Sequence, residues 1–320
     1  MLRNPLVPRL QGLGATIFAE MSALALATGS VNLGQGFPDV DGPDEIKQLV
    51  VYAIWAGRNQ YAPGPGVPEL RAAIVDHQKR FYGVQLDADT DVLVTAGATE
   101  AVAAAMLALV DSGDEVIALE PYYDSYAASI AMAGGVRVPV TLRAPDFRLD
   151  VERLRAAVTD RTKLILLNTP HNPTGTVLTR IELQAIADLA IERNLIVVTD
   201  EVYEHLVYEG EHVPIATLPG MWERTLTISS AGKTFAFTGW KIGWATGPAE
   251  LVTAVRTTKQ FMTFTNAAPM QPAIAHGLVM PDQYFTTLAS DLRRKRDLLC
   301  AGLTDIGFEV FKPAATYFVT

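Results

Sequence analysis

One lysine in this sequence lies in a setting that suits chemistry better than solvation. Lys233 belongs to the segment Ser229–Phe235, which is rich in small residues and hydroxyl groups and follows a strand-like run, Thr225–Ile228. Burial lowers the pKa of an ammonium group, so a lysine held in this way can be a free amine that forms a Schiff base with an aldehyde. A phosphate-binding P-loop would need glycine where Thr227 stands, which excludes that motif. Most lysines are solvated surface charges, so Lys233 alone does not establish a reactive amine. The residues upstream of it must show whether a cofactor site is present.

Those upstream residues follow a regular alternation of short apolar strands and amphipathic helices. This alternation predicts an α/β fold with a largely parallel sheet covered by helices on both faces. Strands are expected at 91–95, 115–119, 136–140, 163–167, 195–200, 225–228, 308–311 and 316–319. Helices are expected at 16–27, 43–57, 68–82, from 97 onward, 125–133, 151–158, 181–193, 249–264, 269–279 and 282–303.

Several chemically unusual segments fall where these strands end. They are Gly97–Thr99, Tyr122–Tyr123, Asn168–Gly175, Asp200–Tyr203 and Ser230–Lys233. Ligands of such sheets bind at the carboxyl ends of the strands. We therefore expect these segments to form one site.

The first of these segments suits a phosphate group. Gly97, Ala98 and Thr99 occupy a strand-to-helix turn, where free N–H groups and the helix dipole favour an anion. Ser230 and Lys241 can add donors. A plain α/β turn is the alternative for this segment taken alone.

The remaining segments suit an aromatic aldehyde with a basic ring nitrogen. Asp200 can keep that nitrogen protonated from a rigid strand end, and Tyr203 or Asn172 can donate a hydrogen bond to a ring oxygen. Tyr123 offers a flat apolar partner for the ring, and Lys233 an amine for the aldehyde. Together with the phosphate cradle, these residues specify pyridoxal 5′-phosphate.

Two loops near the N-terminus are also candidates for binding. Asn32–Asp39 contains Gly34 and Gly36 but lacks the third glycine of a dinucleotide fingerprint. Gly36 can expose its backbone to a substrate, or the segment can be a tight turn. The loop around Tyr61 is rich in proline and glycine, and Tyr61 offers it a phenol.

Composition narrows the class of protein. The chain has 320 residues, 49% hydrophobic and 19% charged, which is typical of a globular protein with two domains. A net charge of −9 argues against a nucleic-acid surface. The single cysteine, Cys300, excludes an internal disulfide and a cysteine-cluster metal site, and we expect no other metal site. The low cysteine content also fits a cytoplasmic location. The apolar run Ala101–Val110 is far shorter than the roughly 20 residues of a membrane span, so no membrane partner is expected. No cleavage-site pattern follows the apolar segment Met21–Ala27, so no signal peptide is expected.

In its motifs the chain resembles the class I/II (fold type I) pyridoxal-phosphate aminotransferases, and within them the kynurenine/methionine group and the bacterial N-succinyldiaminopimelate aminotransferases. The matching stretches are Asn32–Pro38, Asn59–Tyr61, Gly97–Glu100, Glu120–Tyr126, Asn172–Gly175, Asp200–Tyr203 and Ser230–Phe235. The resemblance implies that Lys233 is the Schiff-base lysine and proton shuttle, with an amino acid and a 2-oxo acid as substrates. It also implies a homodimer in which Tyr61 reaches the phosphate of the neighbouring subunit. Lys241 stands where many relatives have arginine.

The resemblance also predicts the domain organisation. It implies an N-terminal arm and part of a small domain at 1–40, a large cofactor-binding domain at 41–280 and an incomplete small domain at 281–320. The family's chain continues past Thr320 and there carries the arginine that binds the substrate carboxylate, to which no arginine of this sequence corresponds. Relatives also have glycine where Ala315 stands.

Three activities are compatible with these residues. In the first, a donor amino acid displaces Lys233, which then moves the α-proton, and the aromatic loops favour an apolar, aromatic or sulfur-containing donor. The donor of the N-succinyldiaminopimelate enzymes is an alternative substrate. The second activity is β-elimination from cysteine conjugates, which begins with the same proton loss. The third is a non-catalytic pyridoxal-phosphate module, as in aminotransferase-like transcription regulators.

Overall fold

The computed structural model describes residues 5–13, 17–34, 36, 38 and 40–320, and its centre is one mostly parallel sheet. Within these residues seven strands follow the order β1-β7-β6-β5-β4-β2-β3. The strands β3, β2, β4, β5 and β6 are parallel, whereas β7 runs antiparallel to both β6 and β1. The strands are β1 (Val92–Thr95), β2 (Glu115–Glu120), β3 (Val136–Thr141), β4 (Thr162–Asn168), β5 (Ile196–Asp200), β6 (Thr225–Ser230) and β7 (Gly243–Thr246).

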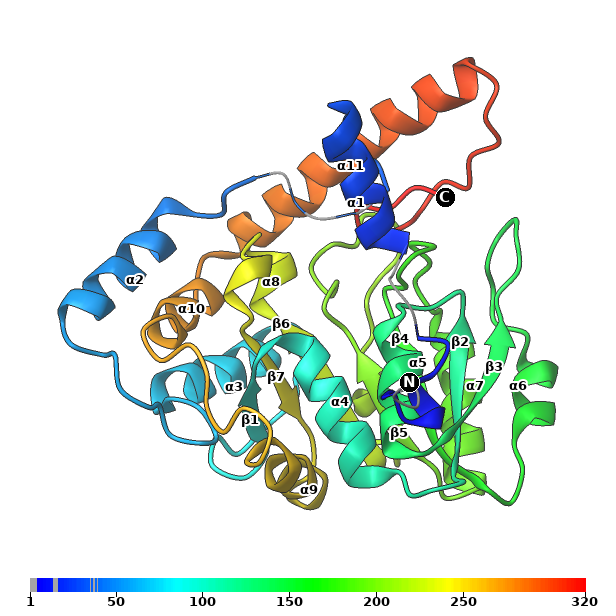
Figure 1. Ribbon diagram of the computed structural model, residues 1–320, viewed down its shortest axis with the longest axis horizontal. Coiled ribbons are helices and arrows are strands. Elements are labelled where there is room, and N and C mark those ends of the chain that lie inside the picture. Colours follow the sequence, from blue (N-terminus) through cyan, green and yellow to red (C-terminus); the bar gives the residue numbers. More distant parts are fainter. Residues whose placement is uncertain (1–4, 14–16, 35, 37, 39) are drawn as a thin grey trace.

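Helices cover both faces of this sheet, as the alternating pattern predicts (Figure 1). One apolar core cluster joins the sheet to α4, α5 and α9, and another joins it to α6 and α7. A third cluster packs α2, α3 and α10 around β1 and β7. The helices are α1 (Ile17–Thr28), α2 (Asp44–Trp55), α3 (Pro68–Tyr82), α4 (Gly97–Leu109), α5 (Ser125–Ala133), α6 (Val151–Ala157), α7 (Arg180–Glu192), α8 (Ala231–Thr234), α9 (Ala249–Lys259), α10 (Gln271–Leu278) and α11 (Asp282–Asp305).

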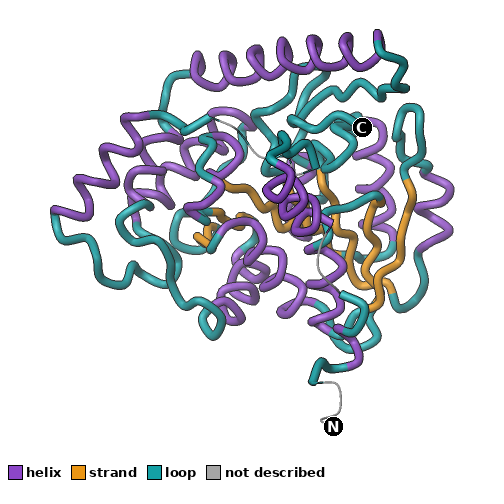
Figure 2. The backbone as a smooth tube through the Cα atoms, turned by 45° about the horizontal axis from the view of Figure 1, so that its top comes forward, coloured by secondary structure: helices purple, strands orange, loops and turns teal. Residues whose placement is uncertain are grey.

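The long helix α11 stands apart from these layers. It has 24 residues and runs across the top of the molecule in Figure 2, beyond the end of the sheet that carries the candidate site. Its charged residues alternate with apolar ones that face the interior, such as Phe285. Among the described residues, no helix combines the length and the apolar character needed to cross a bilayer.

Local sequence signals explain several element boundaries. Thr179 and Glu182 form a reciprocal capping box that starts α7, and Gly83 ends α3 in the left-handed conformation at φ 70°. The middle of β4, Leu164–Leu167, is continuously apolar because both faces of the strand are buried there.

The end of the chain departs from the expectation. The strands expected at 308–311 and 316–319 are wrong, since both segments are loop, with one isolated bridge between Ala315 and Val207. Thr316 has φ 70°, a conformation that an extended strand does not allow. The sequence reading also missed β7, a four-residue strand that begins with glycine. The division into domains at residues 40 and 280 stays a prediction.

Candidate active site

Two cavities meet at Lys233. The polar cavity has a volume of about 680 Å³ and lies at the carboxyl ends of β4, β5 and β6, and the apolar cavity has a volume of about 770 Å³ and lies under α11. Gly36, Lys233 and Phe318 line both. The polar cavity is also lined by nearly all residues expected to bind a cofactor: Gly97, Ala98, Thr99, Tyr123, Asn172, Asp200, Tyr203, Ser230 and Lys241.

At one end of the polar cavity, the start of α4 forms the cradle expected for a phosphate. Gly97 has φ 74°, and a β-carbon on Gly243 of β7 would lie 2.6 Å from the Gly97 carbonyl carbon and 2.7 Å from the Ala98 nitrogen. Only glycine therefore lets β7 pass this close to the first turn of α4. The Ser230 side chain does not cap α8, which leaves its hydroxyl to the cavity. A helix start with small residues and nearby donors suits an anion.

Lys241 supplies the cation of this cradle. Its Nζ lies 3.4 Å from Thr99 Oγ1, and partial burial together with Lys233 lowers its pKa. Its backbone is left-handed at φ 52°, which is strained for lysine. Asn266 holds this conformation by donating to the carbonyls of Lys241, at 3.1 Å, and Thr95, at 3.2 Å.

Asp200 lies at the end of β5 and is 5% exposed. It accepts hydrogen bonds from Tyr126 Oη at 2.7 Å and, less directly, from the Val202 N–H at 3.3 Å. Burial raises the pKa of Asp200, and it also raises that of Tyr126 well above its usual value, so Tyr126 stays a donor. Among the described residues, Asp200 makes no ion pair within 4.0 Å. A buried carboxylate without a cation fits the protonated ring nitrogen of pyridoxal 5′-phosphate.

A second hydrogen-bonded unit positions the residues expected at the ring oxygen. Asn168, at the end of β4, donates to the Asp200 carbonyl at 2.8 Å and accepts from the Asn172 N–H at 2.7 Å. The Asn172 amide then lies 3.5 Å from Tyr203 Oη. Because β4 and β5 are paired with Asn168 opposite Asp200, the sheet register sets these positions.

Lys233 is partly buried in α8, the single turn that follows β6. Its Nζ donates to Tyr317 Oη at 3.0 Å and lies 5.6 Å from the centre of the Tyr203 ring. The amine therefore sits between the two cavities, within reach of a ligand in either.

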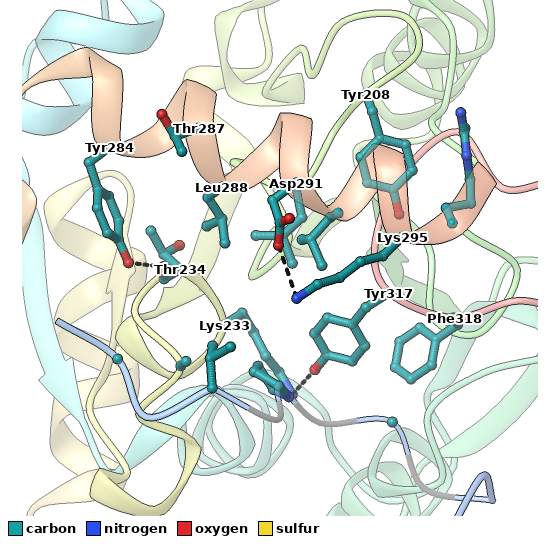
Figure 3. Close-up of a pocket in the computed structure, with 18 of the residues that line it drawn as sticks. Tyr208, Lys233, Thr234, Tyr284, Thr287, Leu288, Asp291, Lys295, Tyr317 and Phe318 are labelled. Atoms are coloured by element: carbon teal, nitrogen blue, oxygen red, sulfur yellow. Dashed lines mark hydrogen bonds and ion pairs between the residues drawn. The ribbon is translucent and has the colours of Figure 1, made fainter. Parts of the chain in front are cut away.

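The apolar cavity is built mainly from one face of α11. Figure 3 shows Tyr284, Leu288, Asp291 and Lys295 pointing from this helix toward Lys233. Two of these side chains are charged, and they form an ion pair in which Lys295 Nζ lies 2.9 Å from Asp291 Oδ2. Leu288 packs with Phe318 against Tyr203 and its neighbours, so the two cavities share one apolar wall.

Of the other two expected residues, Gly36 lines both cavities and Tyr61 lines neither. Gly36 lies at the junction, where a β-carbon would come within 2.2 Å of the Phe318 ring, so glycine is needed there. Tyr61 is not brought to either cavity. It is 82% exposed and packs edge-on against Phe264 at 5.6 Å, so its expected role toward a neighbouring subunit stays a prediction.

Three residues of the site were missed from the sequence. Tyr126 follows Tyr123 by three residues, about one helical turn, and that spacing could have placed it beside the cavity. Tyr317 and Phe318 gave no local signal, because more than 80 residues separate Tyr317 from its partner Lys233.

A buried histidine cluster lies behind the site. Nitrogen and oxygen atoms of His77, Glu204 and His205 lie within 4.8 Å of one another. The two imidazoles share a hydrogen bond of 2.7 Å between their Nε2 atoms, and Ser229 donates to Glu204 at 2.5 Å. These hydrogen bonds account for the cluster as a structural unit that ties β6 and the Asp200 segment to α3.

Comparisons with known proteins agree with this geometry. The sequence profile described as "Aminotransferase class I and II" matches residues 28–320. The chain is 55% identical over 317 residues to a probable N-succinyldiaminopimelate aminotransferase of Mycobacterium tuberculosis, covering 98% of this chain and 80% of the relative. It is 42% identical over 322 residues to the methionine aminotransferase of Escherichia coli, covering 100% of this chain and 83% of that protein. The solved structure of N-succinyldiaminopimelate aminotransferase from Mycobacterium tuberculosis superposes with a TM-score of 0.94 at 53% identity, covering 98% of this chain and 82% of that one. The chain therefore belongs to the class I and II aminotransferases, a family of enzymes.

Proposed function

We propose that this aminotransferase binds pyridoxal 5′-phosphate in the polar cavity and takes the side chain of its amino donor in the apolar cavity. The observation that carries the proposal is the position of Lys233, whose amine lies where the two cavities meet. A transamination site needs a cofactor and a donor on either side of one reactive amine, and this arrangement provides both.

Each end of the cofactor has a matching group in the polar cavity. The start of α4, Ser230 and Lys241 would hold the phosphate, and Asp200 would pair with the ring nitrogen. Tyr203 and Asn172 would donate to the ring oxygen, and Tyr123 would pack against the ring. When bound, pyridoxal phosphate supplies an aldehyde for amines and a ring that withdraws electrons from the α-carbon of an amino acid.

The chain's own residues then carry out the proton chemistry. Lys233 would hold the aldehyde group of the bound cofactor, and once a donor amino acid has taken that place, the free Nζ of the lysine would accept the donor's α-proton and carry it to the product. Asp200 is buried and held by Tyr126, so its carboxylate stays fixed opposite the ring nitrogen. Fixed charges of this kind need no reorganisation during the reaction.

The lining of the apolar cavity favours a donor with an apolar, aromatic or sulfur-containing side chain. Leu206, Leu288, Leu292 and Phe318 offer contact area without hydrogen-bond donors. A second candidate donor is N-succinyldiaminopimelate, the substrate named for the relative of 55% identity. We propose that the acceptor is a 2-oxo acid in either case.

We further propose that the enzyme works as a homodimer in the cytoplasm. Large apolar side chains exposed on α2 and near α9 favour a subunit interface: Tyr52 is 71%, Trp55 86% and Phe261 82% exposed. Tyr61 lies in the same group of exposed aromatics. The one cysteine, Cys300, is free and buried, which suits a reducing compartment.

The test is reconstitution of the purified protein with pyridoxal phosphate, followed by a screen of amino donors with 2-oxo acids. A visible absorption band that Lys233→Ala abolishes, together with a loss of amino transfer of about 10⁴-fold, the upper end of the range for a lost general base, would support the proposal. Lys295→Ala serves as the control for the absorption band, because Lys295 lines the apolar cavity and lies outside the proposed cofactor site. Retention of the band in Lys233→Ala would refute the assignment of the amine.

The same screen separates the alternatives. Faster turnover with methionine or an aromatic amino acid than with N-succinyldiaminopimelate supports the apolar donor, and the reverse supports the second candidate. Pyruvate release from a cysteine conjugate without any acceptor would indicate β-elimination. Cofactor binding without turnover of any donor would favour a non-catalytic module.

A further inference from the structure

The hydrogen bond between Lys233 and Tyr317 joins the reactive amine to a segment that no motif of the sequence identifies. Nζ donates to Tyr317 Oη at 3.0 Å, as Figure 3 shows, and lies 5.7 Å from the centre of the Tyr317 ring. No other hydrogen bond or ion pair of the Lys233 amine is found among the described residues. Tyr317 is thus the polar group that sets the direction of the free amine.

Tyr317 is itself held firmly from both sides. Its ring packs edge-on against Tyr203 at 5.7 Å and an interplanar angle of 80°, and it contacts Phe318 at 4.8 Å. Burial raises the pKa of Tyr203 well above its usual value, with Tyr317 contributing, so Tyr203 remains a neutral phenol beside it. The Tyr317 hydroxyl therefore has a defined position rather than a range of rotamers.

The backbone before Tyr317 is strained in a way that aims this side chain. Thr316 is fully buried with φ 70°, a conformation that is unfavourable for a β-branched residue. Hydrogen bonds hold it there, since the Thr316 N–H donates to the Leu206 carbonyl at 2.8 Å and Tyr208 Oη donates to the Thr316 carbonyl. Strain that persists under such restraint is often found at functional positions.

This segment is also tied to the loop that carries Asn172. The Gly175 carbonyl accepts from the N–H groups of Ala314, at 3.1 Å, and Ala315, at 3.0 Å. A β-carbon on Gly175 would lie 2.2 Å from the Pro313 side chain and 2.7 Å from the Ala315 carbonyl oxygen, so the two segments are in close contact. The position of Tyr317 is therefore set by the same loop that lines the polar cavity.

From this geometry we propose that Tyr317 is a positioning residue, whose hydroxyl holds the free amine of Lys233 at the junction of the two cavities whenever the lysine is not bound to the cofactor. The role during the reaction rests on the proposed function, but the pairing itself does not. A free lysine side chain has several rotatable bonds, and an acceptor at its tip keeps the amine where it must take a proton.

The experiment compares Tyr317→Phe, which keeps the ring, with Tyr284→Phe as a matched control. Tyr284 lines the same cavity and donates to the Thr234 carbonyl at 2.9 Å, next to Lys233 in sequence, but it does not touch the amine. Apo protein is treated with a limiting amount of acetic anhydride, and peptide mass spectrometry gives the labelling rate of Lys233 relative to Lys241. We expect Tyr317→Phe to raise this ratio roughly 10-fold, the size of effect of a lost hydrogen bond to a charged group, and Tyr284→Phe to leave it unchanged. Equal ratios in wild type and Tyr317→Phe would overturn the proposal.

A further measurement addresses the role during the reaction. In the loaded enzyme, a single-turnover reaction with an α-deuterated donor should show slower proton loss and a larger isotope effect in Tyr317→Phe. A protein that binds no pyridoxal phosphate would refute the proposed function while leaving the labelling result to judge the pairing.

Discussion

The two cavities that meet at Lys233 are built in different ways. The polar cavity is formed by strand ends and helix starts, so the positions of its groups follow from sheet register and backbone hydrogen bonds. The apolar cavity is formed by side chains of α11 and by the loop that carries Tyr317, which meet mainly through apolar packing and, at one edge, through a hydrogen bond of 2.6 Å from Arg296 to the Pro313 carbonyl. The first is a set of fixed atoms, and the second is an apolar surface.

This difference predicts two kinds of response to mutation. A change of one atom in the polar cavity removes a specific interaction for which nothing nearby can substitute. A change in the apolar cavity removes contact area, and its cost scales with that area.

Among the changes that compare the two cavities, the largest effect is expected from Asp200→Asn. Losing the carboxylate that is proposed to pair with the ring nitrogen of the cofactor should lower amino transfer about 10²- to 10³-fold, the range found for other fixed electrostatic groups. Because Asp200 is buried without a cation and its pKa is raised, the apo variant should unfold at a urea concentration no lower than wild type. Single-turnover kinetics and urea titration measure the two effects.

Asp124→Asn is the matched control for this change, because Asp124 lines the same cavity without pairing with Tyr126. A loss of activity as large as that of Asp200→Asn would show that charge in the cavity matters in general, and not this one position.

The next effect concerns the phosphate cradle. In Gly243→Ala the new β-carbon would lie 2.6 Å from backbone of the first turn of α4, which cannot move without disturbing the cradle. We expect the variant to lose about 2 kcal/mol of unfolding free energy and to bind pyridoxal phosphate more weakly. Gly239→Ala, where no atom lies within 4 Å, should change neither. Unaltered cofactor affinity in a fluorescence titration of Gly243→Ala would contradict this account of the cradle.

The same contrast explains which parts of the molecule could be predicted from sequence. The parallel sheet and the gathering of Gly97, Asp200 and Lys233 at its carboxyl edge followed from strand patterns, because strand ends of a parallel sheet meet. Tyr317 could not be found, because its place depends on a left-handed Thr316 and on a contact with a helix turn far away in the chain. Extended backbone was expected there from apolar residue types, and β7 was missed because four residues beginning with glycine carry little pattern.

A third prediction concerns the loss of folding stability at low pH, which we expect from a buried histidine in the loop that carries Asn172. His171 is 2% exposed in the Asn168–Gly175 loop, and burial lowers its pKa to about 4. In the unfolded chain its pKa is near 6.5, so between pH 7 and pH 5 the unfolded state takes up a proton that the folded state does not. Stability therefore falls as pH falls, by about 2 kcal/mol over this window from His171. Burial lowers the pKa of His205 to about 3, which adds in the same direction, whereas the raised pKa of Asp200 opposes it.

The measurement is urea unfolding of the apo protein at pH 7, 6 and 5. His171→Gln should flatten the dependence on pH, and His276→Gln, which changes an exposed histidine of α10, should leave it as in wild type. Identical slopes for wild type and His171→Gln would show that this loop is not the acid-sensitive element.

The smallest effect is expected in the apolar cavity and decides whether it receives the donor. Leu288 faces the cavity from α11, whereas Leu298 lies on the same helix and is 73% exposed. Leu288→Ala should raise KM for an apolar donor about 10-fold, since lost apolar contact in a pocket costs on the order of 1–3 kcal/mol, and should leave cofactor affinity unchanged. Leu298→Ala should change neither quantity. If Leu288→Ala weakens cofactor binding as much as donor binding, the two cavities act as one site, and the separation between fixed polar atoms and apolar surface does not hold.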